Sequence, residues 1–383
     1  MPGLRIAYVT SMRSRKYGGL ERFVLSVARE CAARGHRFFA VCETEPAIQA
    51  FVQDMASAGA HLIVMPGATQ RSRFFLWVAR WLHGRGIDVL HAHFVNPAPN
   101  LSLLAARLVG VPLPLFTFHG SMSPEQMRNG LGLRSEVVAR IRRSLGARFF
   151  TVSKAVCEQW RRLGLGGPRM VVHYIGIAPQ PARRSREEVR RELGLGPEDL
   201  VLTCFAYHYL VKGVDVLLQA VARLTGEFPS LRLLVVGGTD LPGEADDMKR
   251  QARALGVADR VVWLDFRDDV PDLLAATDVY CQPSRREGMG FAPLEAMAAR
   301  VPVVASRVGG MCESIVDGHT GVLVPPESPT ALADALAGLL RDEAKRRQMG
   351  EAGARRVRRC FLLQENTRRL IDTYERMARR VRR

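Results

Sequence analysis

Two glutamates with seven residues between them, Glu287 and Glu295, stand in a stretch whose composition suits ligand binding. The stretch begins at Ser284, holds two glycines and continues into an alanine-rich run, so we expect a loop that leads into a helix. A predicted strand over 278–282 precedes it. This order directs backbone N–H groups at an anion, while carboxylates accept hydrogen bonds from sugar hydroxyls. The stretch therefore predicts a nucleotide-sugar pocket, with one glutamate for the ribose and one for the sugar. An ordinary surface loop is the alternative.

Lys212 is the candidate cation for the phosphate groups of such a ligand. It lies between a predicted strand over 201–205 and a predicted helix, and Gly213 follows it directly. A lysine at the end of a strand is a natural partner for a diphosphate. A solvated surface lysine is less expected, because only five of the 55 basic residues are lysines.

Two loops in the first half also follow predicted strands. Gly18 and Gly19 precede the first helix, and paired glycines let a phosphate approach a helix N-terminus. They do not form a Gly-x-Gly-x-x-Gly fingerprint, so an ordinary dinucleotide fold is not supported, and a simple capping loop is the favoured alternative. His119 and Gly120 follow a strand over 113–118, where a histidine can meet a sugar near its reactive carbon.

His91 and His93 lie two positions apart on a predicted strand over 89–93. We expect their side chains to point to opposite faces, with His91 in the core and His93 toward the ligand, and therefore no shared metal. No Asp-x-Asp pair stands in a metal-binding loop either. The sequence therefore predicts no metal site.

The elements that position these residues alternate between strands and helices. Expected strands cover 4–10, 38–42, 61–65, 89–93, 113–118 and 148–152, then 201–205, 231–236, 261–264, 279–282, 303–305 and 321–324. Expected helices include 20–34, 48–58, 74–85, 101–108 and a C-terminal segment, 331–383, that is helical throughout. The alternation predicts an α/β class with mostly parallel sheets, whose ligands bind at the carboxyl ends of the strands.

The 383 residues suffice for two domains, each with its own core. The boundary falls near Gly176 and Pro179, before a charged run. No apolar run reaches the length of a membrane-spanning helix, and the N-terminus has no signal-peptide pattern. Seven scattered cysteines without a Cys-x-x-Cys pair favour a reducing cytoplasm.

The net charge of +17 lies almost entirely in the first half. Residues 1–185 hold 25 Lys and Arg against 9 Asp and Glu, whereas the remainder holds 30 against 29. This excess predicts an anionic partner, which is a membrane surface, a nucleic acid or a phosphorylated substrate. Few aromatics and no recognisable binding module argue against nucleic acid. A genome rich in arginine is the alternative, but such a bias should affect both halves.

The segment 71–85 mixes arginines with Phe74, Phe75, Trp77 and Trp81. That mixture suits a helix lying at a membrane interface. The helical spacing of its apolar residues favours the other interpretation, in which the helix packs against a core.

Taken together and in order, several motifs resemble those of the retaining glycosyltransferases of family four, which have the GT-B architecture. The resemblance covers nearly the whole chain and is strongest from Lys212 to Val324. The matching pieces are Gly18-Gly19-x-Glu21, His119-Gly120, Val152-Ser153-Lys154-Ala155, Lys212-Gly213, Glu287 with Glu295, and the run from Val308-Gly309-Gly310 to Asp317-Gly318-x-Thr320-Gly321.

The resemblance implies two Rossmann-like domains that face each other across a cleft. Residues 1–178 would form the acceptor domain, completed by a returning C-terminal helix over 362–383, and residues 179–361 would form the nucleotide-sugar domain. The implied catalytic set is His119, Lys212 and Glu287. The implied donor-binding set is Gly18, Gly19, Lys212, Gly213, Phe266, Glu287, Gly288, Met289, Gly290, Phe291 and Glu295. In this set Glu287 contacts the donor sugar, Glu295 the ribose, Lys212 and the Gly19 amide the diphosphate, and the backbone near Phe266 the base.

The implied activity is transfer of a hexose, with retention of configuration, from a UDP- or GDP-linked sugar to a glycolipid, oligosaccharide or polysaccharide. No cofactor beyond this donor is expected. The protein would work in polysaccharide biosynthesis as a peripheral protein on the anionic inner face of the membrane. The family usually has an arginine five residues before the lysine, where this chain has Tyr207, beside His208. This departure leaves open a nucleotide-sugar-binding protein without turnover. A nucleotide-sugar epimerase of the same architecture is a second alternative.

Overall fold

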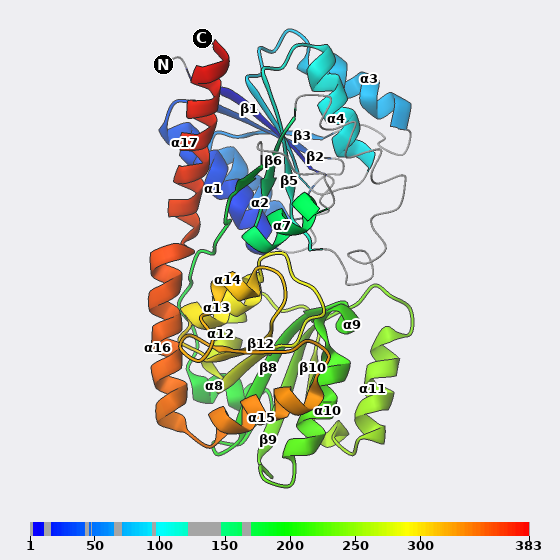
Figure 1. Cartoon of the computed structure of the whole chain (residues 1–383), viewed down its shortest axis with the longest axis vertical. Coiled ribbons are helices and arrows are strands. Elements are labelled where there is room, and N and C mark those ends of the chain that lie inside the picture. Colours follow the sequence, from blue (N-terminus) through cyan, green and yellow to red (C-terminus); the bar gives the residue numbers. More distant parts are fainter. Residues whose placement is uncertain are drawn as a thin grey trace. The chain divides into compact units, whose positions relative to one another are not determined.

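The chain forms two compact units. The computed structural model describes residues 3–10, 17–42, 46, 48–64, 71–93, 97–121, 147–162 and 170–382. Unit 1 comprises Met1–Ala178 together with Leu363–Arg383, and unit 2 comprises Pro179–Leu362 (Figure 1). Each unit contains a parallel sheet with helices on its faces, which confirms the predicted α/β class.

The sheet of unit 1 has seven parallel strands in the order β3-β2-β1-β4-β5-β6-β7. Its central strands are mostly apolar and almost wholly buried because helices cover both faces of the sheet. The strands are β1 (Arg5–Thr10), β2 (Arg37–Cys42), β3 (His61–Val64), β4 (Val89–His93), β5 (Leu113–Phe118), β6 (Arg148–Thr151) and β7 (Met170–Val172). The helices are α1 (Gly19–Ala33), α2 (Gln49–Ser57), α3 (Arg71–Leu82), α4 (Pro97–Leu108), α7 (Lys154–Arg162) and α17 (Leu363–Arg382).

Helix α1 starts at the paired glycines, at the end of the sheet where β1 has its carboxyl end. Phe23 and Val27 lie one turn apart on its buried face, so the amphipathic pattern predicts which side packs on the sheet. At its start the Gly18 N–H donates to the Glu21 carboxylate at 3.0 Å, which satisfies one of the donors left free at a helix N-terminus. Gly35, with φ +72°, follows the helix and ends it as expected.

The C-terminal segment is helical over residues 331–382, as expected, apart from two short breaks. Three helices occupy this segment: α15 (Pro329–Leu340), α16 (Glu343–Cys360) and α17. Asp342 starts α16 because its side chain accepts a hydrogen bond from the Lys345 N–H at 2.8 Å. The Leu363 N–H donates to the Ile177 carbonyl at 2.8 Å, so the backbone leaves its helical pattern there and α17 begins on unit 1.

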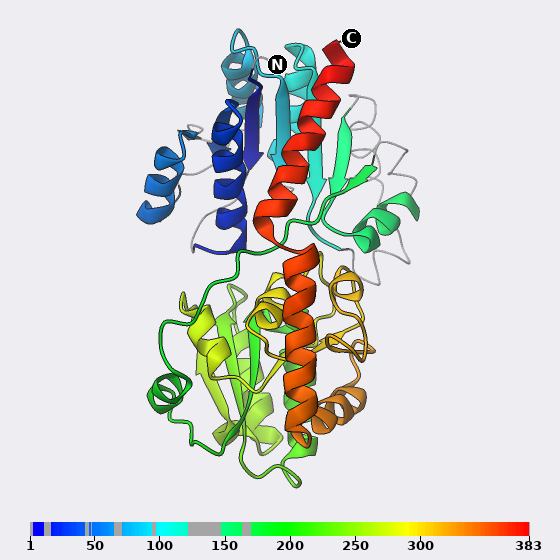
Figure 2. The same ribbon diagram turned by 90° about the vertical axis from the view of Figure 1, so that its left-hand side faces the viewer.

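Helix α17 packs beside α1 and the sheet of unit 1 (Figure 2). Its Tyr374 is fully buried, with its hydroxyl 2.6 Å from that of Tyr8 in β1. Ser26 of α1 and Thr367 of α17 join through their hydroxyls at 2.9 Å. The last helix is therefore part of the core of unit 1.

Unit 2 contains six parallel strands in the order β10-β9-β8-β11-β12-β13. They are β8 (Leu200–Tyr207), β9 (Leu231–Gly238), β10 (Val261–Leu264), β11 (Val279–Gln282), β12 (Val303–Ser306) and β13 (Val322–Val324). The helices, besides α15 and α16, are α8 (Arg186–Glu192), α9 (Tyr209–Lys212), α10 (Val214–Leu224), α11 (Glu244–Ala254), α12 (Val270–Ala275), α13 (Phe291–Ala298) and α14 (Met311–Ser314), with a 3-10 turn at Ala258–Arg260. Leu202, Leu233 and Val304 are fully buried where helices pack on this sheet.

The expectation that His91 and His93 point to opposite faces is wrong. Their ring centroids lie 4.2 Å apart, on one face of β4. Successive residues of a strand alternate between faces, so residues two apart share a face. His91 is in the core as expected, where its Nε2 lies 2.7 Å from the Thr117 hydroxyl and its Nδ1 contacts the Tyr374 hydroxyl.

Helix α3 covers most of the arginine-rich and aromatic segment. Val78, Trp81 and Leu82 are buried, whereas Leu76 is 59% exposed, so one face packs against unit 1 as the helical spacing predicts. Phe74 lies outside the residues whose side chains the structure describes. A search of the described helices finds none with both the length and the apolar character required to span a bilayer.

Candidate functional site

Unit 2 has a topological switch point between β8 and β11. The chain builds outward from β8 through β9 and β10 on one side, and from β11 through β12 and β13 on the other. Ligands of such sheets bind outside the carboxyl ends of the strands where the order reverses. Lys212 follows β8 and Glu287 follows β11, so the topology brings both predicted residues to this edge.

Lys212 and Glu287 form an ion pair at the switch point. The Lys212 Nζ donates to Glu287 Oε1, and the Ser284 hydroxyl donates to the same oxygen at 3.1 Å. The two charged side chains are 23% and 12% exposed, so solvent reaches a pair that is otherwise enclosed. An ammonium group beside an accepting carboxylate has the chemistry to hold a phosphate and a sugar hydroxyl.

Two glycines allow the loops around this pair to approach each other. Gly213 has φ +73°, and a Cβ there would lie 2.0 Å from the Pro283 carbonyl oxygen. Gly309 has φ +51°, and a Cβ there would lie 1.7 Å from the carbonyl oxygen of Glu287. Both positions therefore require glycine for backbone conformation and for space. The Gly310 N–H donates to the Gly288 carbonyl at 3.0 Å, which joins the two glycine-containing loops.

The second glutamate lies on α13, one turn from its start. The helix begins at Phe291, after the two glycines of the loop as expected, with Gly290 as its N-cap at φ +79°. Met289 is buried, so its side chain packs inside the unit. Burial raises the pKa of Tyr280 well above its usual value, and the charges of Glu287 and Glu295 raise it further.

Tyr207 and Phe266 form an exposed aromatic pair at the carboxyl ends of β8 and β10. Their ring centroids are 5.6 Å apart, and Phe266 is 52% exposed. The Tyr207 hydroxyl donates to the Asp240 carboxylate at 2.6 Å. His208, next in the chain, has φ +61°, an uncommon conformation for a residue other than glycine. Asp240 was not predicted from the sequence, which has no local signal for it.

The predicted residues of the first half lie in unit 1. Gly18 and Gly19 are at the start of α1, and His119 follows β5. The His119 Nε2 lies 2.9 Å from the Nδ1 of His93, so these two imidazoles are hydrogen-bonded to each other. Burial is the main reason that the pKa of His119 falls to about 3 and that of His173 to about 4. These imidazoles are therefore neutral near pH 7.

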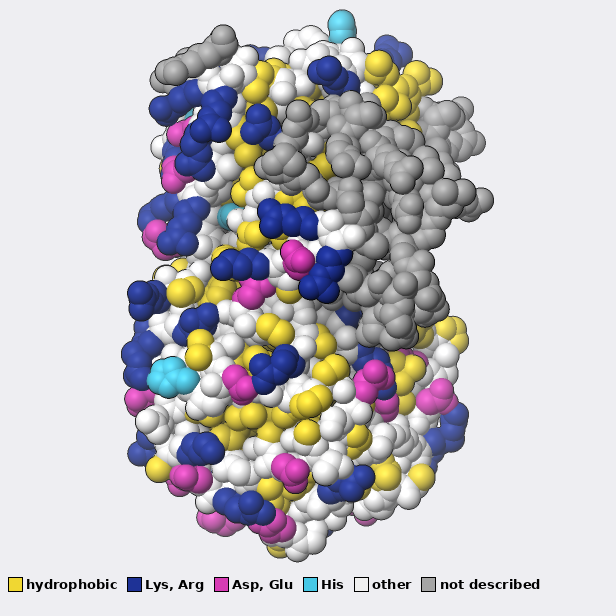
Figure 3. Space-filling view, viewed as in Figure 1, with side chains coloured by type: hydrophobic (Ala, Val, Ile, Leu, Met, Phe, Trp, Pro, Cys, Tyr) yellow, Lys and Arg dark blue, Asp and Glu magenta, His cyan; other side chains and the backbone are white. Residues whose placement is uncertain are grey.

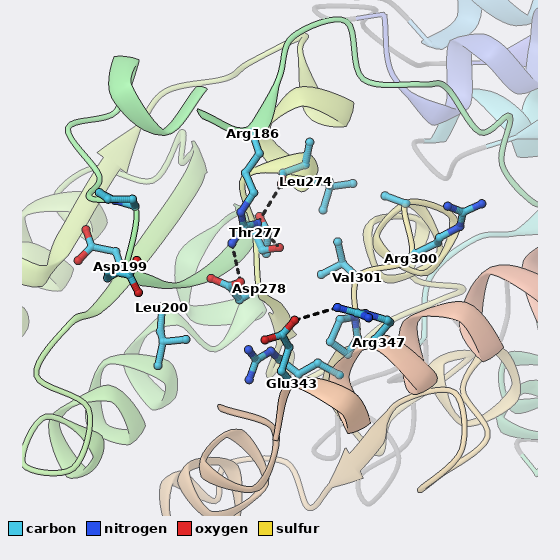
Figure 4. Close-up of a pocket in the computed structure, with 16 residues that line it drawn as sticks. Arg186, Asp199, Leu200, Leu274, Thr277, Asp278, Arg300, Val301, Glu343 and Arg347 are labelled. Atoms are coloured by element: carbon cyan, nitrogen blue, oxygen red, sulfur yellow. Dashed lines mark hydrogen bonds and ion pairs between the residues drawn. The ribbon is translucent and has the colours of Figure 1, made fainter. Parts of the chain in front are cut away.

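A separate pocket lies at the opposite, amino ends of the strands of unit 2 (Figure 4). Several of its charges are already paired within the protein. Arg186 donates to Asp278 at 2.6 Å, and Arg347 donates to Glu343 at 2.9 Å. Arg346 donates to two carbonyls at the end of α15. These contacts explain the charged lining as a support of the fold, and they leave the switch point as the candidate site.

Among the residues that the structure describes, no group of three or more His, Cys, Asp or Glu side chains is arranged to hold a metal ion. The sequence also failed to indicate Ser284 as a partner of Glu287. A signal was available, because polar residues at 280, 282 and 284 interrupt an otherwise apolar buried strand and its continuation.

Two family models and several known proteins match this chain. The family described as "Glycosyl transferases group 1" matches residues 185–356, and "Glycosyltransferase Family 4" matches residues 17–180. A phosphatidyl-myo-inositol mannosyltransferase of Mycobacterium leprae is 33% identical over 356 residues, with 89% of each chain covered. A D-inositol 3-phosphate glycosyltransferase of Corynebacterium diphtheriae is 29% identical over 376 residues, covering 88% of this chain and 84% of that relative.

Solved structures show the same fold. Anabaena HepE, in complex with UDP and glucose, superimposes with a TM-score of 0.81 at 23% identity, covering 97% of this chain and 99% of that one. WaaG, a glycosyltransferase involved in lipopolysaccharide biosynthesis, gives a TM-score of 0.73 at 20% identity, covering 96% and 99%. The chain therefore belongs to the group 1, family 4 glycosyltransferases and has their GT-B fold.

Proposed function

We propose that this glycosyltransferase moves a hexose from a UDP- or GDP-linked sugar to a lipid-linked or polysaccharide acceptor, with retention of configuration. The observation that carries the proposal is the Lys212–Glu287 pair at the switch point of unit 2. It supplies a cation for a diphosphate and an acceptor for a sugar hydroxyl within one site. The complex of Anabaena HepE with UDP and glucose supports a donor of this class.

Breaking the bond between the sugar and the diphosphate places negative charge on the leaving group and positive charge on the sugar ring. Preorganised donors at the diphosphate lower the barrier, and loss of one such donor typically costs about 3–4 kcal/mol. In the proposed reaction Lys212 and the backbone N–H groups at the start of α13 take this role. The diphosphate replaces Glu287 as the partner of Lys212, and the Glu287 carboxylate then accepts a hydrogen bond from a hydroxyl of the sugar. His119 is neutral at pH 7 and donates or accepts a hydrogen bond without a charge of its own.

Unit 1 is proposed to receive the acceptor. It holds 30 Lys and Arg against 12 Asp and Glu, whereas unit 2 holds 25 against 26, so the excess positive charge belongs to unit 1 alone. Basic side chains gather on unit 1 along α17, while basic and acidic side chains are interspersed on unit 2 (Figure 3). This distribution supports an anionic acceptor at the surface of an anionic membrane. The phosphatidyl-inositol and inositol-phosphate relatives support the same chemistry.

A panel of UDP- and GDP-hexoses tests the proposal. We expect one nucleotide class to stabilise the protein against heat, by about 2.7 kcal/mol at a hundred times its dissociation constant. The stabilising sugar should then be transferred to phosphatidylinositol-containing vesicles or to free inositol phosphate. Failure of every nucleotide sugar to stabilise the protein would refute the donor assignment.

Binding without turnover remains the second candidate, and Tyr207 in place of the family arginine motivates it. Stabilisation by a nucleotide sugar, without transfer to any acceptor and without hydrolysis, would favour this candidate. The relatives named above are transferases, which supports transfer rather than epimerisation.

A further inference from the structure

A row of buried polar side chains runs through the core of unit 2 toward Glu287. Tyr280 and Gln282 lie on β11 and Ser284 lies just beyond it, at alternate positions that share one face of an extended chain. All three are buried, with exposures of 0%, 1% and 0%. Strands buried on both faces are normally apolar, because each buried polar group needs a partner. Three such groups in a row call for a specific explanation.

Hydrogen bonds join these side chains end to end, and their directions follow from the chemistry of the groups. The Tyr280 hydroxyl accepts from the Phe205 N–H at 3.3 Å and donates to the Oε1 of Gln282. That bond orients the amide, so the Gln282 Nε2 faces Ser284 and donates to its hydroxyl at 3.0 Å. Ser284 in turn donates to the Oε1 of Glu287 at 3.1 Å. Each donor has one acceptor, and the row ends at the carboxylate.

Glu287 has a second partner, Lys212, on the same oxygen. These two contacts differ in what donor binding does to them. In the proposed reaction the Lys212 ammonium binds the diphosphate instead of Glu287. Ser284 keeps its place, because Gln282 donates a hydrogen bond to its hydroxyl and Tyr280 in turn orients Gln282. Ser284 is then the contact that keeps the orientation of Glu287 in the loaded enzyme.

We propose that Tyr280, Gln282 and Ser284 are positioning residues that hold the Glu287 carboxylate in its orientation toward the donor sugar. The proposal rests on the proposed function of this site. It predicts an effect on the sugar part of the donor and on turnover, and little effect on the nucleoside diphosphate part. A merely structural role predicts lower stability without that selectivity.

Binding measurements with two ligands test this selectivity. The ligands are the nucleoside diphosphate and the matching nucleoside-diphosphate hexose, titrated into wild type, Ser284→Ala and Gln282→Leu. We expect wild type to bind the hexose form more tightly than the diphosphate alone. Both variants should keep their diphosphate affinity within about twofold and lose most of the gain due to the sugar.

Turnover should fall about ten- to hundredfold in Ser284→Ala, the range typical for loss of one hydrogen bond to a charged group, with KM for the donor changed less than kcat. Tyr280→Phe removes only the most distant hydroxyl and should lower turnover less than Gln282→Leu. Tyr280→Phe removes one hydroxyl oxygen, as Ser284→Ala does, but at the far end of the row, so it provides a second test where Ser284→Ala fails to fold.

Ser306 provides a matched control. It lies at the end of the neighbouring strand β12, is 1% exposed, and its hydroxyl has no hydrogen-bond partner within the described structure. Ser306→Ala should leave both affinities and turnover unchanged. Equal losses of turnover and sugar affinity in Ser284→Ala and Ser306→Ala would overturn the positioning role. So would turnover within twofold of wild type in Tyr280→Phe, Gln282→Leu and Ser284→Ala alike. If wild type binds neither ligand, the proposed donor site fails instead, so the two failures are distinguishable.

Discussion

The Lys212 ammonium and the Glu287 carboxylate, 75 residues apart in the sequence, are paired at the edge where the strand order of unit 2 reverses. Each charge is the partner of the other in the structure, and a nucleotide sugar offers a replacement to both. Its diphosphate suits the ammonium, and its hydroxyls suit the carboxylate. The consequences of removing either charge therefore differ.

Glu287→Gln should lower transfer at least about hundredfold, because the charged acceptor of the donor sugar is lost. The same change releases Lys212 from its carboxylate, so affinity for the nucleoside diphosphate should stay equal or rise. Lys212→Met should weaken that affinity and lower kcat as well. Titration calorimetry with the diphosphate, together with a transfer assay, separates the two variants. Unchanged transfer in Glu287→Gln contradicts the assignment of the site.

Glu295→Ala should weaken donor binding with little effect on the chemical step, because the expected contact of this residue is the ribose. Loss of a hydrogen bond to a charged group is worth about 1.5–3 kcal/mol, so the donor dissociation constant should rise about ten- to hundredfold. Donor-dependent kinetics measure this as a higher KM with kcat preserved. A fall in kcat at saturating donor would contradict the assignment of Glu295 to the ribose.

Tyr207→Arg should preserve or raise donor affinity. The Asp240 carboxylate accepts a hydrogen bond from the Tyr207 hydroxyl at 2.6 Å, and it could form an ion pair with the guanidinium of an arginine at position 207. Tyr207→Phe is the matched control, because it removes only the hydroxyl and should change donor affinity less than about threefold. A clear loss of affinity in the arginine variant, with the phenylalanine variant unaffected, would show that the aromatic ring has a role of its own.

Acid should destabilise unit 1. Burial lowers the pKa of His119 to about 3 and that of His173 to about 4, and it also lowers the pKa values of His91 and His93. In the unfolded chain these groups titrate near 6.5, so the unfolded state binds more protons between about pH 6.5 and 4. The free energy of unfolding therefore has its full value above pH 6.5. It decreases as the pH falls below 6.5, by at most about 1.4 kcal/mol per pH unit for each histidine.

Chemical denaturation between pH 7.5 and 5, followed by tryptophan fluorescence, checks this slope, since Trp77, Trp81 and Trp160 belong to unit 1 and Trp263 alone to unit 2. His173→Gln should make the slope shallower. Stability that is constant over this pH range would show that the histidines are hydrated in solution.

The protein should bind anionic vesicles and not neutral ones, and salt should release it. Each basic residue near an anionic surface contributes about 1 kcal/mol. Replacing Arg376 and Arg380, both exposed on α17, by glutamine should therefore weaken binding about ten- to thirtyfold. Arg223→Gln with Arg253→Gln in unit 2 removes the same charge and should have little effect. Vesicle sedimentation measures all three proteins. Equal binding to both kinds of vesicle contradicts the proposed membrane surface.

The local structure of this protein is determined by short stretches of its sequence. The strands at 89–93, 113–118, 261–264 and 279–282 have the bounds that their apolar patterns predict, and α1 has the face and the terminal glycine expected of it. Strand and helix periodicities are properties of neighbouring residues, so they can be read without knowledge of the fold. The same holds for the loop with Glu287 and for the helix that follows it.

The pairings between distant residues were decided by the tertiary structure. The order of strands in a sheet depends on how all helices pack, and that order puts Lys212 beside Glu287 and Tyr207 beside Asp240. The C-terminal segment expected to be helical is divided into three helices, because Asp342 caps a new helix and the Leu363 N–H bonds to Ile177. From the sequence alone, Tyr280 and Gln282 would be expected to destabilise a buried strand, because their hydrogen-bond partners are not known. A buried polar group is costly alone and favourable when satisfied, and only the folded chain supplies the partners that decide between these outcomes.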